Sequence, residues 1–296
     1  MIRQTNASRS TTFADNRYAM NLWITTGLAG LILASTPSVL ADDFAEKGRA
    51  IFNKYQHSVV TVEIVLKSKF SMGGMGGQQN ESRQDVTGTV VEPSGLTVVS
   101  LSATDPGQMM QNLMAGMSDE DSKFKVETEL SDLKILLEDG TETPAEVVLR
   151  DRDLDLAFIR PKTRLNAPLP ALDLNNSAKV QLLEPVLALN RLGTVAGRAY
   201  AASEERISAI VERPRRFYVP ATSTITTTLG APAFTMDGKV LGLFVIRSQK
   251  SRGGGGGMNM FNAQRENVAG IIVPAEDVLK AAKQVPPPGG EKPAGK

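Results

Sequence analysis

The sequence predicts an all-β protein, built either as a β-sandwich or as a pair of β-barrels. Past residue 41, the apolar residues form short runs rich in Val, Ile, Leu and Thr, without the spacing of an amphipathic helix. Between these runs stand short sequences that favour tight reversals, namely Pro93-Ser94-Gly95, Asp139-Gly140 and Asp237-Gly238. Alternating strand and turn signals of this kind are typical of a fold made mainly of antiparallel strands.

The runs that we expect to form strands are short and share a high content of β-branched and aliphatic residues. They lie at residues 58–66, 86–91, 96–101, 133–137, 145–149, 156–159, 186–189, 209–211, 223–228, 240–246 and 268–273.

Only two helices are expected, at residues 43–54 and 275–284. Pro274 suits the start of the second helix, and the prolines at 286–288 end it. The tail 285–296 is dominated by Pro, Gly and charged residues, so we expect it to be disordered. Residues 164–170 contain two prolines between strand clusters and are the predicted linker between two halves.

Three segments interrupt the strand pattern and are predicted to be surface loops: 71–80, 105–131 and 253–257. The first is rich in Gly, Met and Gln, the second carries four methionines, and the third is five consecutive glycines. Methionine side chains adapt to many shapes, so the Met-bearing loops can be read as a binding surface. The preferred interpretation is a short helix whose methionines cover the core.

The N-terminal 41 residues are typical of a secretory signal. Arg3, Arg9 and Arg17 precede an apolar run at 22–34, and small residues lead to a predicted cleavage after Ala41. The alternative is a retained membrane anchor, but the run is shorter than the roughly 20 apolar residues that cross a bilayer. We therefore expect an exported protein of the bacterial periplasm or cell envelope, or a secreted one, without a membrane span after cleavage.

Charge and cysteine content exclude several classes of function. Removal of the signal leaves 30 Lys and Arg against 31 Asp and Glu, a formal charge of −1, so no nucleic-acid partner is implied. The chain has no cysteine, and hence no disulfide and no thiol nucleophile. No phosphate-binding loop or metal-ligand spacing is present, and we expect neither a cofactor nor a metal. Six arginines between 191 and 216 alternate with Glu204, Glu205 and Glu212, which predicts a solvated face of mixed charge.

Four stretches in order carry a family pattern. Residues 88–99 read GTVVEPSGLTVV; residues 133–160 contain LKILLEDG and then DLAFIR; residues 185–211 contain PVLALNRLG and ISAIV; and residues 227–242 read TTLGAPAFTMDGKVLG. Together they resemble the protease domain of the HtrA/Deg family of trypsin-like serine peptidases. The resemblance covers roughly residues 45–284.

This resemblance implies two antiparallel six-stranded β-barrels with a short C-terminal helix. The implied domains are an N-terminal region with the first barrel at 42–163 and a second barrel with the helix at 171–284. Family members often carry a PDZ module after the protease domain, and we expect none after residue 284 of this sequence.

When the catalytic positions of the family are aligned with this sequence, two of the three hold a different residue type. The catalytic His falls on Ser102, the acid on Asp155 and the nucleophilic Ser on Leu229, while Thr227 and Gly230 stand in the loop that forms the oxyanion hole. A triad needs an imidazole that accepts the hydroxyl proton and returns it to the leaving amine. Neither a Leu side chain nor a Ser hydroxyl can serve in these roles.

The only histidine of the chain, His57, precedes the position that the family uses and is expected to be a strand-end or loop residue. The sequence therefore predicts a pseudoprotease that binds a peptide or protein segment near the cleft between the barrels. Two alternatives remain: a serine hydrolase with a relocated site such as a Ser-Lys dyad, and a structural or assembly protein of the cell envelope. Composition does not determine the oligomeric state.

Overall fold

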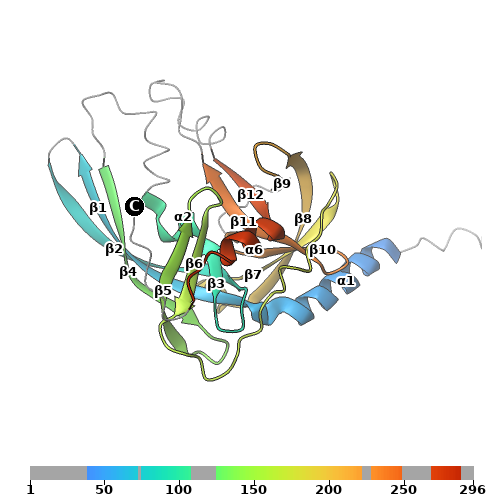
Figure 1. Cartoon of the computed structure of the whole chain (residues 1–296), viewed down its shortest axis with the longest axis horizontal. Coiled ribbons are helices and arrows are strands. Elements are labelled where there is room, and N and C mark those ends of the chain that lie inside the picture. The colour runs from blue at the N-terminus through green and yellow to red at the C-terminus, as the bar shows by residue number, and fades with distance from the viewer. Residues whose placement is uncertain (1–38, 73–74, 108–124, 222–227, 249–267, 288–296) are drawn as a thin grey trace, which may run out of the picture. The chain divides into compact units, whose positions relative to one another are not determined.

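Two closed six-stranded barrels make up most of the structure, a computed structural model that describes residues 39–72, 75–107, 125–221, 228–248 and 268–287 (Figure 1). The first barrel has the strand order β1-β2-β3-β6-β5-β4, and the second has the order β10-β11-β12-β9-β8-β7. All neighbouring strands pair antiparallel. The predicted fold class, a pair of trypsin-like barrels with a short C-terminal helix, is confirmed.

The strands divide evenly between the barrels, and the predicted linker 164–170 lies between β6 and β7. The first barrel contains β1 (Val59–Met72), β2 (Met75–Val90), β3 (Thr97–Ser100), β4 (Lys125–Leu136), β5 (Glu142–Asp151) and β6 (Leu156–Pro161). The second contains β7 (Pro185–Arg191), β8 (Tyr200–Val211), β9 (Phe217–Pro220), β10 (Pro232–Thr235), β11 (Val240–Ser248) and β12 (Val268–Pro274).

Strand β1 shows how the sequence builds the first barrel. Alternate residues Val60, Val62, Ile64 and Leu66 are buried in one hydrophobic cluster with apolar residues from the other strands. Successive side chains of a strand point to opposite faces, so this alternation turns one face of β1 toward the barrel interior. Burial of side chains of this size from all six strands provides the main stabilisation of the barrel.

Two helices flank the barrels. Helix α1 (Val39–Tyr55) spans the predicted helix 43–54 and the predicted cleavage position, and Tyr55 stacks on Phe234 at 4.8 Å between ring centroids. Helix α6 (Ala275–Ala282) buries Ala275, Val278 and Ala281, in agreement with the helix predicted there. The prediction of only two helices is wrong, because a one-turn helix, α2 (Leu101–Thr104), and two short 3₁₀ helices, η1 (Gln56–Ser58) and η2 (Thr194–Ala196), are also present.

All three predicted turns are present. Their glycines, Gly95, Gly140 and Gly238, have φ values of 92°, 83° and 77°. These values lie in the left-handed region, where residues with a Cβ are strained. Glycine placement thus fixes where three strands reverse.

Two of the predicted loops are wrong in part. Residues 71–72 and 75–80 belong to the β1–β2 hairpin, whose pairing runs as far as Met72 opposite Met75. Residues 125–131 belong to β4, which pairs with β1 as far as Lys125 opposite Ser71. The first segment is rich in Gly and Gln, so it lacks the alternation that marks a strand with one buried face. The second alternates Val126, Thr128 and Leu130 with charged residues, a strand pattern that the loop prediction overlooked. The other residues of the predicted loop 105–131, from 108 to 124, and the glycine run 253–257 lie outside the described residues.

Two strands were not predicted. Strand β9 lies between Pro214 and Pro220, and β10 begins at Pro232, so prolines obscured both short runs. The predicted strand at 223–228 lies outside the described residues except for Thr228, which is not in a strand.

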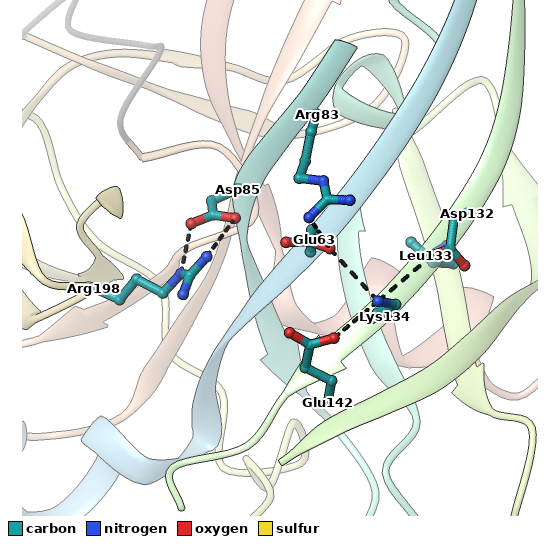
Figure 2. A network of polar contacts seen from close by, with 8 residues as sticks. All are labelled: Glu63, Arg83, Asp85, Asp132, Leu133, Lys134, Glu142 and Arg198. Carbon is teal, nitrogen blue, oxygen red and sulfur yellow. Dashed lines mark hydrogen bonds and ion pairs between the residues drawn. The ribbon is translucent and has the colours of Figure 1, made fainter. Parts of the chain in front are cut away.

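The two barrels meet along one face of strand β2. Asp85 forms an ion pair with Arg198 at 2.7 Å, as Figure 2 shows, and the Thr89 hydroxyl donates a hydrogen bond of 2.7 Å to the Gly230 carbonyl. Between them, the Thr87 hydroxyl accepts a hydrogen bond from the backbone N–H of Arg191. Residues 85, 87 and 89 point to the same side of the strand, so three successive side chains of this face hold the second barrel.

A charged network covers the outer face of the first barrel next to this contact. Lys134 lies between Glu142, at 2.8 Å, and the buried Glu63, at 3.9 Å, and Arg83 lies 3.6 Å from the same Glu63 carboxylate (Figure 2). Glu63 is removed from water but surrounded by cations, which offsets the cost of burying its charge.

The predicted mixed-charge face at 191–216 is only partly correct. Arg206 pairs with Glu204 and Arg216 pairs with Glu212 on the surface. Glu205, however, is 8% exposed, and its side chain shares the inward face of β8 with Ile207. The charge pattern did not reveal the burial of Glu205, because neighbouring residues of a strand, here Glu204 and Glu205, point to opposite faces of the sheet.

The β2 contact can be tested with Thr89→Val, which keeps the side-chain shape and removes the donor to Gly230. We expect the free energy of unfolding to fall by about 1–2 kcal/mol, because a buried carbonyl loses its partner. Urea denaturation measures this change. Thr163→Val, at an exposed position just before the linker, is the control and should change stability by less than about 0.5 kcal/mol. Equal stability of the two variants would contradict the role of this hydrogen bond.

Candidate active site

Asp155, the predicted acid, lies in the turn directly before β6. Its φ of 55° is unusual for a residue with a side chain. The Asp155 carbonyl accepts a hydrogen bond of 2.8 Å from the N–H of Leu101, the first residue of α2. Strand β3 pairs with β6 at Ser100 opposite Leu156, so the end of β3 and the start of β6 are held side by side.

The Asp155 carboxylate accepts four hydrogen bonds. Oδ1 accepts from the backbone N–H of Ser102 at 2.8 Å and from its hydroxyl at 2.6 Å. Oδ2 accepts from the Ser100 hydroxyl at 2.5 Å and from the backbone N–H of Ile246 at 3.0 Å. Because Ile246 belongs to β11, this one carboxylate joins the first barrel to the second.

Burial sets the acidity of this group. It raises the pKa of the Asp155 carboxyl above the ordinary value of 3.8, while the hydrogen bonds from Ser100, Ser102 and Ile246 act in the opposite direction. Burial disfavours a charged carboxylate, and donors favour it. No cation forms a described ion pair with Asp155, so hydrogen bonds alone compensate its negative charge.

Ser102, at the predicted histidine position, is therefore in contact with the predicted acid. It is half-buried in α2, and both its hydroxyl and its N–H point at Oδ1. In a triad the acid accepts the N–H of the histidine, which fixes the orientation of the imidazole. Here the Ser102 hydroxyl makes the hydrogen bond to the carboxylate that an imidazole would make.

Leu229, at the predicted nucleophile position, is half-buried in a tight turn. The turn is closed by the Ala231 N–H, which donates 2.9 Å to the Thr228 carbonyl. Gly230 has a φ of 81°, and a Cβ there would lie 2.1 Å from the Thr87 carbonyl oxygen, so only glycine fits. The turn thus keeps a tight shape against the first barrel while presenting a hydrocarbon side chain.

The oxyanion loop is only partly described. Thr227 lies outside the described residues. The Gly230 N–H donates 2.8 Å to the Phe244 carbonyl, so this donor is engaged inside the fold and does not point at a substrate oxygen. An oxyanion hole needs N–H groups free to converge on one point.

His57 lies away from this cluster. It belongs to η1, the short 3₁₀ helix that directly precedes β1. Its Nδ1 lies 2.9 Å from the Glu138 carboxylate, and its ring meets the edge of Tyr200 at 5.6 Å. The described hydrogen bonds of Asp155 do not include this imidazole.

Two residues of the cluster were missed from the sequence. Ser100 stands two positions before Ser102 and looks like an ordinary strand residue, and Ile246 contributes only its backbone N–H from 91 positions along the chain.

Among the described residues, no group of three or more His, Asp or Glu side chains could hold a metal ion. No helix in the same part of the chain is long and apolar enough to cross a membrane.

Comparison with known families agrees with this architecture. The model of the trypsin-like peptidase domain matches residues 86–243, which is more than half of the chain and contains Ser102, Asp155 and Leu229. The chain therefore belongs to the trypsin-like peptidase family. No curated protein matches it.

The raised pKa of Asp155 predicts a pH dependence of stability. A folded state that holds a proton more tightly than the unfolded chain gains stability below pH 3.8 and loses it as the pH rises through the folded pKa. The stability of the natural protein relative to Asp155→Asn should therefore fall as the pH rises from 3.8 through the folded pKa. Urea denaturation across this range measures the difference. A relative stability that rises with pH would show that the hydrogen bonds outweigh burial.

Proposed function

We propose that this chain is an exported, non-catalytic member of its family that binds an extended peptide segment beside the Asp155 cluster. The observation that carries the proposal is the hydrogen-bonding of Asp155, in which Ser102 and Ser100 hydroxyls and two backbone N–H groups fill both oxygens. A general base is then missing beside the turn where a nucleophile would stand, and the turn itself carries Leu229.

The single histidine supports the same conclusion. The whole chain contains one imidazole, and it is placed between Glu138 and Tyr200. A serine hydroxyl has no basicity near neutral pH, so Ser102 cannot deprotonate a nucleophile.

A relocated Ser-Lys dyad receives no support from the described lysine contacts. The ammonium groups of Lys134, Lys239 and Lys280 lie 2.8–2.9 Å from carboxylates. A catalytic lysine must be neutral to accept a proton, whereas carboxylate neighbours favour the charged form.

Peptide binding is supported by the part of the β11 edge that pairs with no described strand. Strand β10 pairs with β11 only up to Leu243, while β12 pairs with it as far as Ser248. The Ile246 N–H points away from β12 to reach Asp155, so with a period of two the Ile246 carbonyl and the Ser248 N–H face the same open side. An extended segment could add here by main-chain hydrogen bonds, which need no triad.

The absence of catalysis can be tested with a fluorophosphonate probe, which reacts with activated serines. We expect no labelling of the purified protein under conditions that fully label trypsin, because the one histidine of the chain lies beside Glu138 and Tyr200 and the side chain of Leu229 has no hydroxyl. Mass spectrometry measures the modification. Stoichiometric labelling of one serine, removed by a single Ser→Ala change, would overturn the proposal.

The binding site can be mapped by crosslinking, since the absence of cysteine makes one introduced thiol unique. Leu229→Cys and Val195→Cys variants, each coupled to benzophenone maleimide, are irradiated with a library of extended peptides. Val195 is fully exposed in η2 and serves as the control. We expect crosslinks at position 229 well above those at 195. Equal yields at both positions would place peptide binding elsewhere.

A further inference from the structure

We propose that a basic hollow beside the linker between the barrels is a second binding site, which takes an acidic peptide segment. The hollow has a volume of about 900 Å³, and its walls include Pro93, Arg160, Lys162, Arg164, Leu165 and Pro168. Pockets of roughly 300–1,000 Å³ are the size that encloses a ligand of several groups. It shares no residue with the Asp155 cluster, so the inference does not rest on the proposed function.

The charged side chains in the wall of the hollow are all positive. Three cations, Arg160, Lys162 and Arg164, line it, and no acidic residue is among the described residues of its wall. Acids lie outside the wall: Glu146 is opposite Arg160 in the β5–β6 ladder, and Glu92 accepts a hydrogen bond from Ser94. Glu138, Asp139 and Glu142 line a neighbouring hollow that shares Arg164. Positive side chains grouped in a concave surface favour a negatively charged ligand.

Arg160 has donor capacity left over. One terminal nitrogen donates 2.8 Å to the Pro286 carbonyl, which holds the end of the chain after α6 at the rim of the hollow. Its Nε is buried and has no hydrogen-bond partner. A guanidinium recognises carboxylates through its N–H donors, and only one terminal nitrogen of Arg160 has a described partner, so the group can also bind a carboxylate in the hollow.

The hollow is already formed without a ligand. The Lys162 N–H donates 2.9 Å to the Pro144 carbonyl, and the Leu169 N–H donates 3.0 Å to the Pro93 carbonyl, which holds both ends of the linker segment. A Cβ at Gly95 would lie 2.9 Å from Leu165 Cδ1, so this side chain packs directly on the turn. A wall fixed in this way loses little conformational freedom when it binds.

A peptide fits the hollow better than a free phosphate ion. The wall combines cations with Pro and Leu side chains, and it contains neither a helix N-terminus nor a glycine-rich loop that would surround a phosphate with N–H groups. Carboxylates separated by aliphatic side chains match this mixture. The occupant is therefore an acidic segment that also carries apolar residues.

The test measures fluorescence anisotropy of a labelled peptide that alternates glutamate and leucine, using the full chain. Lys162→Gln/Arg164→Gln removes two exposed cations of the hollow, and Arg152→Gln/Lys179→Gln removes two exposed cations elsewhere. We expect the first variant to bind about tenfold or more weakly and the second to bind like the natural protein. Binding should also weaken with added NaCl.

Three results would overturn the inference. These are no measurable binding, an equal loss in both double variants, or equal binding of a peptide in which glutamine replaces glutamate. Inorganic phosphate is added as a competitor at constant ionic strength. Displacement of the peptide by low phosphate concentrations would instead identify an inorganic anion site, and persistence of the peptide supports the proposal.

Discussion

The buried carboxylate of Asp155 is the constraint on which the centre of this molecule depends. A charge removed from water is costly unless donors surround it, and here the donors come from the end of β3, from α2 and from β11. The hydrogen bonds to this carboxylate require both barrels to be in place, and two of them require the small hydroxyl side chains at positions 100 and 102. In a peptidase the same carboxylate would orient an imidazole. In this chain it joins the two barrels, which is a structural role for the carboxylate.

The second junction, along β2, shows what fixes the shape of the turn at Leu229. Thr89 and Thr87 lie against Gly230, and the glycine is required because the Thr87 carbonyl leaves no room for a Cβ. The shape of the turn is therefore set by packing between the barrels.

Much of this structure could be predicted from local sequence. The glycine turns and the strands with one buried face were readable from residue type and period, and the resemblance located Ser102 and Asp155, which the fold brings into contact. The polar end of the β1–β2 hairpin could not be found, because a ribbon without a buried face carries no alternation. The start of β4 was overlooked although Val126, Thr128 and Leu130 alternate with charged residues. Ile246 was equally invisible, because a backbone N–H leaves no mark in the side-chain sequence. Glu205 was misplaced because charge patterns do not reveal which face of a strand is covered.

The central claim is that one carboxylate, that of Asp155, accepts hydrogen bonds from both Ser102 and Ile246. The most direct measurement is an NMR titration that follows the amide protons of these two residues between pH 3 and pH 7. The account predicts that both resonances move together with a single midpoint above 3.8, because both amides donate to one buried carboxyl group. Resonances that move independently, do not move, or share a midpoint below 3.8 would contradict it.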